Sequence, residues 1–222
     1  MDKNSLLIIS FEGLDTSGKS SQIKALEMRL KLDGIRVKSI HFPNYDSKEG
    51  LLIKEKLHLG DKNFIQHLYI LDQLRFFLDD TIQSKQITLN KEFDNIIKNY
   101  DVLLIDRYEM STLAYYMASK ENFDEAYRFI KELQKDLPKP NMTFILDLPA
   151  TEVVKRKKDL DSFESNFKFM SRIRNSYKMI PMLDDSNRLY ITIDACQNID
   201  YISNCIYKSV KNYINDLKEG SK

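Results

Sequence analysis

The chain of 222 residues contains little cysteine, glycine or proline: two, six and five residues respectively. Its two cysteines, Cys196 and Cys205, lie near the C-terminus, and their surroundings lack the spacing of a disulfide framework or a zinc site. No apolar run near the N-terminus is long enough for a signal peptide or a membrane span. We therefore expect a cytoplasmic protein that does not bind membranes.

The chain also lacks an excess of charge of either sign, because 34 basic and 33 acidic residues leave a net charge of +1. This balance gives no general attraction to nucleic acid, so any basic site must be local. Apolar residues make up 42% of the chain, which is enough for a sizeable core. We expect one domain over residues 1–222 and no nucleic-acid partner.

Apolar runs alternate with amphipathic stretches along the whole chain. The predicted strands are 6–11, 37–42, 101–106, 141–148 and 188–193. The predicted helices are 20–32, 64–84, 91–99, 110–118, 123–135, 151–158, 164–183 and 199–217. This alternation predicts the α/β class, with a five-stranded parallel sheet flanked by helices on both faces.

Two of the six glycines occur at the fixed positions of a phosphate-binding motif, G-x-x-x-x-G-K-[ST]. The motif lies between the first predicted strand and the first predicted helix, where glycines let the backbone approach phosphates closely. Loop N–H groups and the helix N-terminus then face the negative charge. The residues predicted to bind a nucleoside triphosphate are Gly13, Leu14, Asp15, Thr16, Ser17, Gly18, Lys19, Ser20 and Ser21.

Within this motif, we predict that Lys19 reaches the β- and γ-phosphates and that the Ser20 hydroxyl ligates Mg²⁺. Asp15 would repel phosphate, so we interpret it as binding a hydroxyl of a second substrate or as ordering the loop. Asp106 ends a predicted strand, where ligands bind in open α/β sheets, and it can hold Mg²⁺ through water. Arg107 follows it and can clamp a phosphate with two hydrogen bonds.

A basic run covers residues 155–158 and is followed by the acidic stretch DLD at 159–161. Such a run is most often a solvated helix face. It also follows a predicted strand, where a lid can fold over a triphosphate. We therefore predict a small lid near residues 155–164.

The order of these motifs resembles the thymidylate kinase family. The resemblance lies in FEGLDTSGKSSQ at 11–22, FPNY at 42–45, DRYEMSTLAYY at 106–116, LPKPNMTFILDLP at 137–149, DSFE at 161–164 and IDA at 193–195. It extends over almost the whole chain. The combination of the EGxDxxGK[ST] loop with DRYxxSxxAY is specific, although neither part would be so alone.

The resemblance implies a P-loop NTPase kinase fold, usually a homodimer, that transfers the γ-phosphoryl group of ATP to dTMP with Mg²⁺. It implies that loop residues 13–21 bind ATP and that Lys19 and Ser20 have the general roles given above. Asp15 matches the acid that interacts with the sugar 3′-hydroxyl. Arg107 matches the arginine that contacts the acceptor and the transferring phosphates.

The resemblance also implies an acceptor site after the second strand and along the helix after Arg107. Tyr45 matches a position near the acceptor phosphate and sugar, and Phe42 is expected to precede a cis proline bond. Ser111 and Thr112 match positions that contact the pyrimidine. Tyr115 matches the tyrosine under the sugar, which disfavours a ribose 2′-hydroxyl.

One departure from the family concerns the catalytic cation. Many members carry arginine after the loop aspartate, where this chain has Thr16. The resemblance then implies a catalytic cation in the lid, and Arg156 is the first choice.

Other departures concern the base. Tyr69 matches the aromatic residue of an aromatic-x-x-x-Arg pattern, but Gln73 occupies the arginine position. Arg75 lies two residues further along the predicted helix and so points to another face. Either Gln73 reads the base, or the register shifts and Arg75 does. Tyr116 replaces the usual glutamine after the AY pair.

These departures leave alternatives to dTMP open: dUMP, another deoxynucleoside monophosphate, or an unphosphorylated deoxynucleoside. The DRY sequence favours the monophosphates. A GTPase-like switch or a non-catalytic nucleotide binder is a further alternative, but the NKxD pattern typical of guanine binding is matched only imperfectly, by NKEFD at 90–94.

Overall fold

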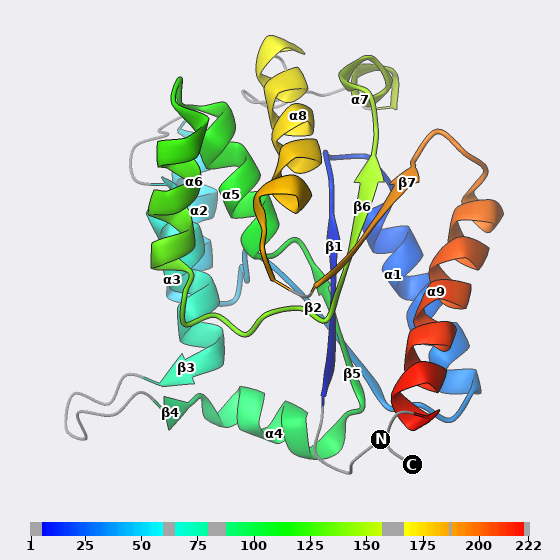
Figure 1. Ribbon diagram of the computed structural model, residues 1–222. Helices are drawn as coiled ribbons and strands as arrows, with labels where there is room; N and C mark the ends of the chain where they lie inside the picture. The colour runs from blue at the N-terminus through cyan, green and yellow to red at the C-terminus, as the bar shows by residue number, and fades with distance from the viewer. Residues whose placement is uncertain (1–5, 60–64, 80–87, 157–166, 187, 220–222) are drawn as a thin grey trace.

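The computed structural model describes residues 6–59, 65–79, 88–156, 167–186 and 188–219 (Figure 1). Its central sheet consists of β1 (Leu7–Glu12), β2 (Val37–His41), β5 (Val102–Asp106), β6 (Met142–Asp147) and β7 (Leu189–Asp194). The five strands lie in the order β2-β5-β1-β6-β7, and all neighbouring pairs are parallel. This confirms the predicted α/β class and all five predicted strands, with shifts of one residue at most ends.

Helices cover both faces of this sheet, as predicted. They are α1 (Lys19–Leu32), α2 (Lys48–His58), α3 (Ile65–Phe77), α4 (Lys91–Asn99), α5 (Glu109–Ala118), α6 (Phe123–Leu133), α7 (Ala150–Arg156), α8 (Phe167–Leu183) and α9 (Ile199–Glu219). Figure 1 shows α1 and α9 on one side of the sheet and α3, α5, α6 and α8 on the other. Of the described helices, none is long and apolar enough to cross a membrane.

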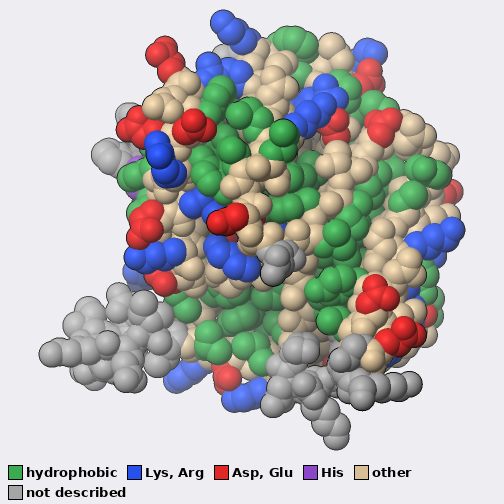
Figure 2. All heavy atoms as spheres, viewed as in Figure 1, with side chains coloured by type: hydrophobic (Ala, Val, Ile, Leu, Met, Phe, Trp, Pro, Cys, Tyr) green, Lys and Arg blue, Asp and Glu red, His purple; other side chains and the backbone are tan. Residues whose placement is uncertain are grey.

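The central strands are apolar because both of their faces are covered. All six residues of β1 are buried, including Ser10 and Glu12. The buried Ser10 hydroxyl finds a partner in the Thr143 hydroxyl of β6 at 2.9 Å. On the outer surface, Lys and Arg side chains are interspersed with Asp and Glu side chains over the face seen in Figure 2, in keeping with the balanced charge of the sequence.

The register of the sheet brings the functional segments to one edge. Phe11 of β1 pairs with Asp106 of β5, and Glu12 pairs with Ile145 of β6. The loop after β1 and the segment after β5 therefore begin side by side, and the Arg107 amide donates to the Phe11 carbonyl at 3.0 Å. This is the carboxyl edge of the sheet, where ligands bind in open α/β folds.

Two segments differ from the prediction. Residues 78–79, predicted to be helical, form β3 (Leu78–Asp79), which pairs antiparallel with β4 (Thr88–Leu89). The helix prediction was wrong there because pairing with a nearby strand outweighs helical periodicity. The rest of that prediction, residues 64 and 80–84, lies outside the described residues.

Helix α2 was not predicted at all. It is capped by Ser47, whose hydroxyl accepts a hydrogen bond from the Gly50 amide at 2.9 Å. Gly50 lies in its first turn, and this position requires glycine because a Cβ atom there would approach the Asn44 carbonyl oxygen to 1.9 Å. A glycine near the start of a charged segment indicates a turn more often than a helix, and for this reason α2 was not predicted.

Candidate active site at the carboxyl edge of the sheet

The phosphate loop between β1 and α1 has the backbone conformation that its glycines allow. Gly13 and Gly18 have φ angles of 138° and 94°. A Cβ atom on Gly13 would lie 2.5 Å from the Leu146 carbonyl oxygen, so a side chain is excluded there. Thr16 Oγ1 and Ser17 Oγ are buried and have no hydrogen-bond partner in the described part of the chain. These hydroxyls and the loop amides suit the oxygens of a bound phosphate.

Lys19 begins α1 and lies within this loop. Its Nζ donates to the carbonyl oxygens of Gly13 at 3.2 Å and Leu14 at 2.9 Å. Burial lowers the pKa of Lys19. Ser21 follows in the first turn of α1 and is exposed. The lysine charge is therefore held where the motif predicts a triphosphate.

Ser20 and Asp106 meet beside the loop, although 86 positions separate them in the sequence. The Ser20 hydroxyl donates to Asp106 Oδ2 at 2.5 Å. A hydroxyl and a carboxylate are hard oxygen donors of the kind that Mg²⁺ prefers. These two residues fit the predicted metal role.

Arg107 connects the phosphate loop to the adjoining cavity. Its backbone is left-handed, with φ at 62°, which is uncommon for a residue other than glycine and is found at functional sites. The guanidinium donates to the Gly13 carbonyl at 3.1 Å and forms an ion pair with Asp15. The strained backbone and these two contacts fix the positive charge at the boundary between loop and cavity.

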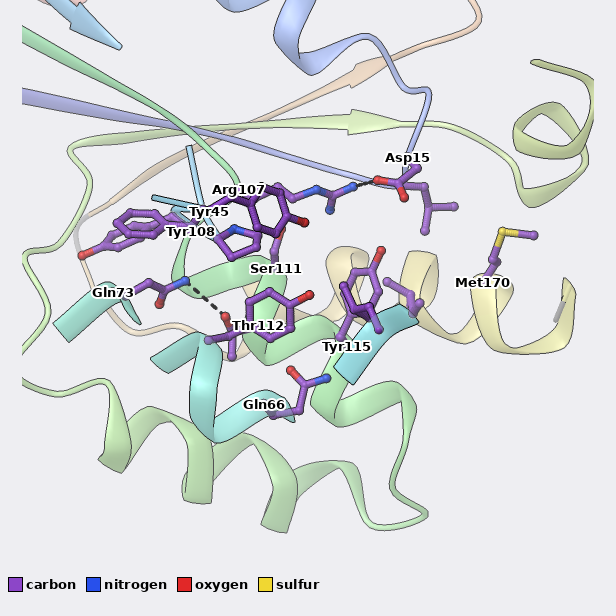
Figure 3. Close-up of a pocket in the computed structure, with 16 residues that line it drawn as sticks. Asp15, Tyr45, Gln66, Gln73, Arg107, Tyr108, Ser111, Thr112, Tyr115 and Met170 are labelled. Carbon is purple, nitrogen blue, oxygen red and sulfur yellow. Dashed lines mark hydrogen bonds and ion pairs between the residues drawn. The ribbon is translucent and has the colours of Figure 1, made fainter. Parts of the chain in front are cut away.

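The cavity next to Arg107 is lined by aromatic, amide and hydroxyl side chains (Figure 3). Eight predicted substrate-binding residues line it: Phe42, Tyr45, Tyr69, Gln73, Arg107, Ser111, Thr112 and Tyr115. The loop residues Leu14 and Asp15 also line it. The bond between Phe42 and Pro43 is cis, as predicted.

The two ends of the cavity differ in charge. Figure 3 shows the Asp15–Arg107 pair at one end and Gln66, Gln73 and Thr112 at the other. The Gln73 Nε2 donates to Thr112 Oγ1 at 3.2 Å. The cavity thus has a charged end next to the phosphate loop and an uncharged polar end away from it.

Two predicted residues lie elsewhere. Arg75 Nε pairs with Glu49 of α2 at 3.1 Å, and its side chain is 62% exposed. The Tyr116 ring stacks on Phe129 of α6 with the centroids 5.6 Å apart. Neither is among the residues that line the cavity. Of the two alternatives for reading the base, the structure therefore brings Gln73, and not Arg75, to the cavity.

Arg156, the predicted lid cation, ends α7 and reaches back to the phosphate loop. It donates to the Thr16 carbonyl at 3.1 Å and to the Ala195 carbonyl at 3.0 Å. The predicted lid begins at residue 155, but residues 157–166 lie outside the described residues. Arg156 is thus placed beside the loop that the motif assigns to the triphosphate.

Sequence reasoning missed Glu12, which lies beneath both the loop and the cavity. Its carboxyl group is fully buried and accepts hydrogen bonds from the Ser111 hydroxyl at 2.5 Å and from the Tyr108 amide at 3.1 Å. The Ser111 hydroxyl also bonds the Tyr177 hydroxyl of α8 at 2.8 Å. Burial raises the pKa of Glu12 to about 7. The sequence feature that could have indicated Glu12 as a functional residue is its position, as an acidic residue at the end of an apolar predicted strand.

Other cavity residues were also missed: Pro43, Leu57, Gln66, Tyr108, Met170 and Ile173. Gln66 could have been found from spacing, because positions 66, 69 and 73 lie on one helix face. Leu57 could not, since α2 was not predicted. Met170 and Ile173 come from α8, whose side chains reach the cavity only through tertiary packing.

Comparison with known proteins agrees with this geometry. A family model described as thymidylate kinase matches residues 11–206. The thymidylate kinase of Thermosipho africanus is 28% identical over 201 residues, which cover 88% of this chain and 93% of that protein. That of Dictyostelium discoideum is 27% identical over 199 residues, covering 89% of this chain and 82% of that protein.

A solved structure of thymidylate kinase from Candida albicans matches with a TM-score of 0.69 and 22% identity, covering 94% of this chain and 92% of that one. At this identity the likeness shows the fold, which is the P-loop kinase fold that the sequence resemblance implied. The family match extends from β1 into α9 and includes the phosphate loop, Arg107 and the cavity helices. The chain therefore belongs to the thymidylate kinase family of nucleoside monophosphate kinases.

Proposed function

We propose that this chain transfers the γ-phosphoryl group of ATP to dTMP, giving dTDP and ADP. One observation carries the proposal: Arg107 bonds the phosphate loop through Gly13 and also lines a cavity with an uncharged polar end. A nucleotide whose phosphate lies at Arg107 and whose base lies at Gln73 would present that phosphate to the loop. The comparisons with known proteins do not favour a kinase for another acceptor.

At the donor side, the loop amides of residues 13–21 and Lys19 hold the phosphates of ATP. Ser20 and Asp106 are the residues that would hold Mg²⁺, and the ion would neutralise charge on those phosphates. Arg156 supplies a further positive charge beside Thr16. These groups surround the moving phosphoryl group with positive charge and N–H donors, which is the main requirement of this reaction.

At the acceptor side, Arg107 binds the phosphate and Asp15 binds the sugar 3′-hydroxyl. Tyr45 and Phe42 lie near the phosphate and sugar, and Tyr115 packs under the sugar. Tyr69, Gln73, Ser111 and Thr112 surround the base. The acceptor atom is already a phosphate oxyanion, so no strong general base is needed, and positioning supplies most of the effect.

Five other expectations from the sequence belong to the same proposal. The chain would act as one domain over residues 1–222, with a small lid near residues 155–164. It would form a homodimer, as the family resemblance implies. It would act in the cytoplasm, without a nucleic-acid or membrane partner.

The test is an ADP-release assay of the purified chain with ATP and Mg²⁺ against dTMP, dUMP, dCMP, dGMP, UMP and thymidine. We expect dTMP to give the highest kcat/KM and EDTA to abolish turnover. Turnover with thymidine alone would overturn the monophosphate assignment. Tight ATP binding without turnover of any acceptor would favour a regulatory nucleotide binder instead.

A further inference from the structure

Four glutamine side chains in the described part of the chain bury a carbonyl oxygen that has no hydrogen-bond partner: Gln22, Gln66, Gln73 and Gln134. Two of them are tied to backbone elsewhere, since Gln22 Nε2 donates to the Ile199 carbonyl at 3.0 Å and Gln134 Nε2 to the Glu109 carbonyl at 2.9 Å. The other two, Gln66 and Gln73, line the cavity. Unpartnered buried acceptors on residues that line a cavity indicate a ligand with hydrogen-bond donors.

The amide of Gln73 is held in place. Only 1% of the residue is exposed, and its Nε2 is engaged by the Thr112 hydroxyl at 3.2 Å. This leaves Oε1 without a hydrogen-bond partner among the described residues, as an acceptor at the wall of the cavity.

Gln66 lies two helical turns before Gln73 on the same face of α3, with Tyr69 between them. Figure 3 shows both amides among the side chains that line the uncharged end of the cavity. The charged side chains that line the cavity, Asp15 and Arg107, lie at its other end. The uncharged end therefore binds its ligand through neutral amides and hydroxyls.

This arrangement favours a particular edge of a base. A cationic side chain favours a ring carbonyl, whereas an amide oxygen favours a ring N–H. Thymine presents one N–H, at N3, between two carbonyl groups. An amide oxygen can accept from N3–H while the amide nitrogen donates to an adjacent carbonyl.

We propose that Gln66 is a specificity-determining residue together with Gln73, and that their carbonyl oxygens make this site select a base with a ring N–H. The inference rests on the proposed function and deepens it, since it names the group of the acceptor that the site reads. It also accounts for a glutamine at a position where the family pattern has arginine.

The test compares dTMP with N3-methyl-dTMP, in which a methyl group replaces the ring N–H. For the wild-type chain we expect kcat/KM to fall by about tenfold or more with the methylated acceptor, which corresponds to the loss of the one hydrogen bond that the ring N–H donates. In Gln66→Met and in Gln73→Met, kcat/KM for dTMP falls by about 5–30-fold, mainly through KM. In these two variants, kcat/KM for N3-methyl-dTMP should change little. The ratio of kcat/KM for dTMP to kcat/KM for N3-methyl-dTMP should therefore be smaller than in the wild-type chain.

Gln22→Met is the matched control, because it removes the same kind of buried amide at a position outside the cavity. For Gln22→Met, the ratio of kcat/KM for dTMP to kcat/KM for N3-methyl-dTMP should equal that of the wild-type chain, even if the variant has a lower melting temperature. Equal use of both acceptors by the wild-type chain would overturn the inference. An unchanged ratio in Gln66→Met would overturn the role of Gln66.

Calorimetric binding of dTMP and N3-methyl-dTMP to the same three variants separates this inference from the proposed function. Selective binding of dTMP without turnover would refute the kinase reaction but support the inference that the site selects a base with a ring N–H. Turnover of dTMP with equal binding of both acceptors would support the kinase reaction and refute the selection of a ring N–H.

Discussion

The phosphate loop takes its groups from one continuous stretch, residues 13–21, whereas the cavity next to it, whose uncharged end lies away from the loop, combines side chains from α2, α3, α5 and α8. The loop works through backbone amides, carbonyls and two glycines with positive φ. The other end works through side chains such as Gln66, Gln73 and Thr112. One end depends on chain geometry and the other on the choice of side chain.

This difference explains which parts of the site keep the family pattern. A side chain at Gly13 would collide with the backbone of β6, so the loop tolerates little change. An arginine-to-glutamine change at position 73 is compatible with the helical backbone of α3 and alters only the side chain, in its charge, length and hydrogen-bonding groups. The reaction can therefore be kept while the way of reading the base changes.

The largest expected effect lies at the phosphate end. Lys19→Ala removes the buried ammonium group between the Gly13 and Leu14 carbonyls, and kcat should fall by about a hundredfold or more. The loss should be equal for every acceptor, as measured by ADP release, because in the proposed function the lysine acts on the phosphates of ATP. Lys24→Ala, an exposed change on the same helix, is the control. Turnover of Lys19→Ala close to wild type would remove the basis for the assignment of the loop.

A second effect tests Glu12, which connects the two ends through Tyr108 and Ser111. Burial raises its pKa to about 7 from 4.5, so the protonated form is favoured in the folded state. Its contribution to stability is complete below pH 4.5 and is lost as the pH rises to about 7, a change of about 3 kcal/mol.

The glutamine side chain in Glu12→Gln cannot ionise, so this variant should not lose that stability as the pH rises. Urea unfolding between pH 4.5 and 8 should therefore show a smaller fall in the free energy of unfolding for the variant than for the wild-type chain. Glu132→Gln changes an exposed carboxylate and should leave the pH dependence as it is. Parallel curves for Glu12→Gln and wild type would contradict the raised pKa.

A third effect lies at the boundary between the ends. Arg107→Lys keeps the charge but loses the planar group that contacts both Gly13 and Asp15, so kcat/KM should fall by about tenfold. The same factor is expected for dTMP and dUMP, because in the proposed function the arginine contacts the phosphate and not the base. Arg36→Lys, at an exposed ion pair, is the matched control. A different factor for the two acceptors would mean that Arg107 also reads the base.

The smallest effect is expected just outside the cavity. Arg75→Ala breaks an ion pair with Glu49 in which the arginine is mostly exposed, so stability should fall by less than about 1 kcal/mol. The KM for dTMP should change by less than about twofold, because Arg75 does not line the cavity. A tenfold rise in that KM would show that Arg75 takes the arginine role of the family after all.

The sequence by itself determined the five strands of the sheet, the phosphate loop and most of the residues around the cavity. Continuous apolar runs form buried parallel strands wherever helices cover both faces, so β1, β5 and β6 could be found from local pattern. The loop could be found because its glycines and lysine act through backbone geometry within a few residues.

Tertiary structure decided the rest. Successive residues of a helix point about 100° apart, so whether Gln73 or Arg75 meets the cavity depends on how α3 is rotated against its neighbours. Glu12 acquires its raised pKa only because β1 is buried among other elements. The partners of both residues, Thr112 and Ser111, are far away in sequence, and packing alone brings them together.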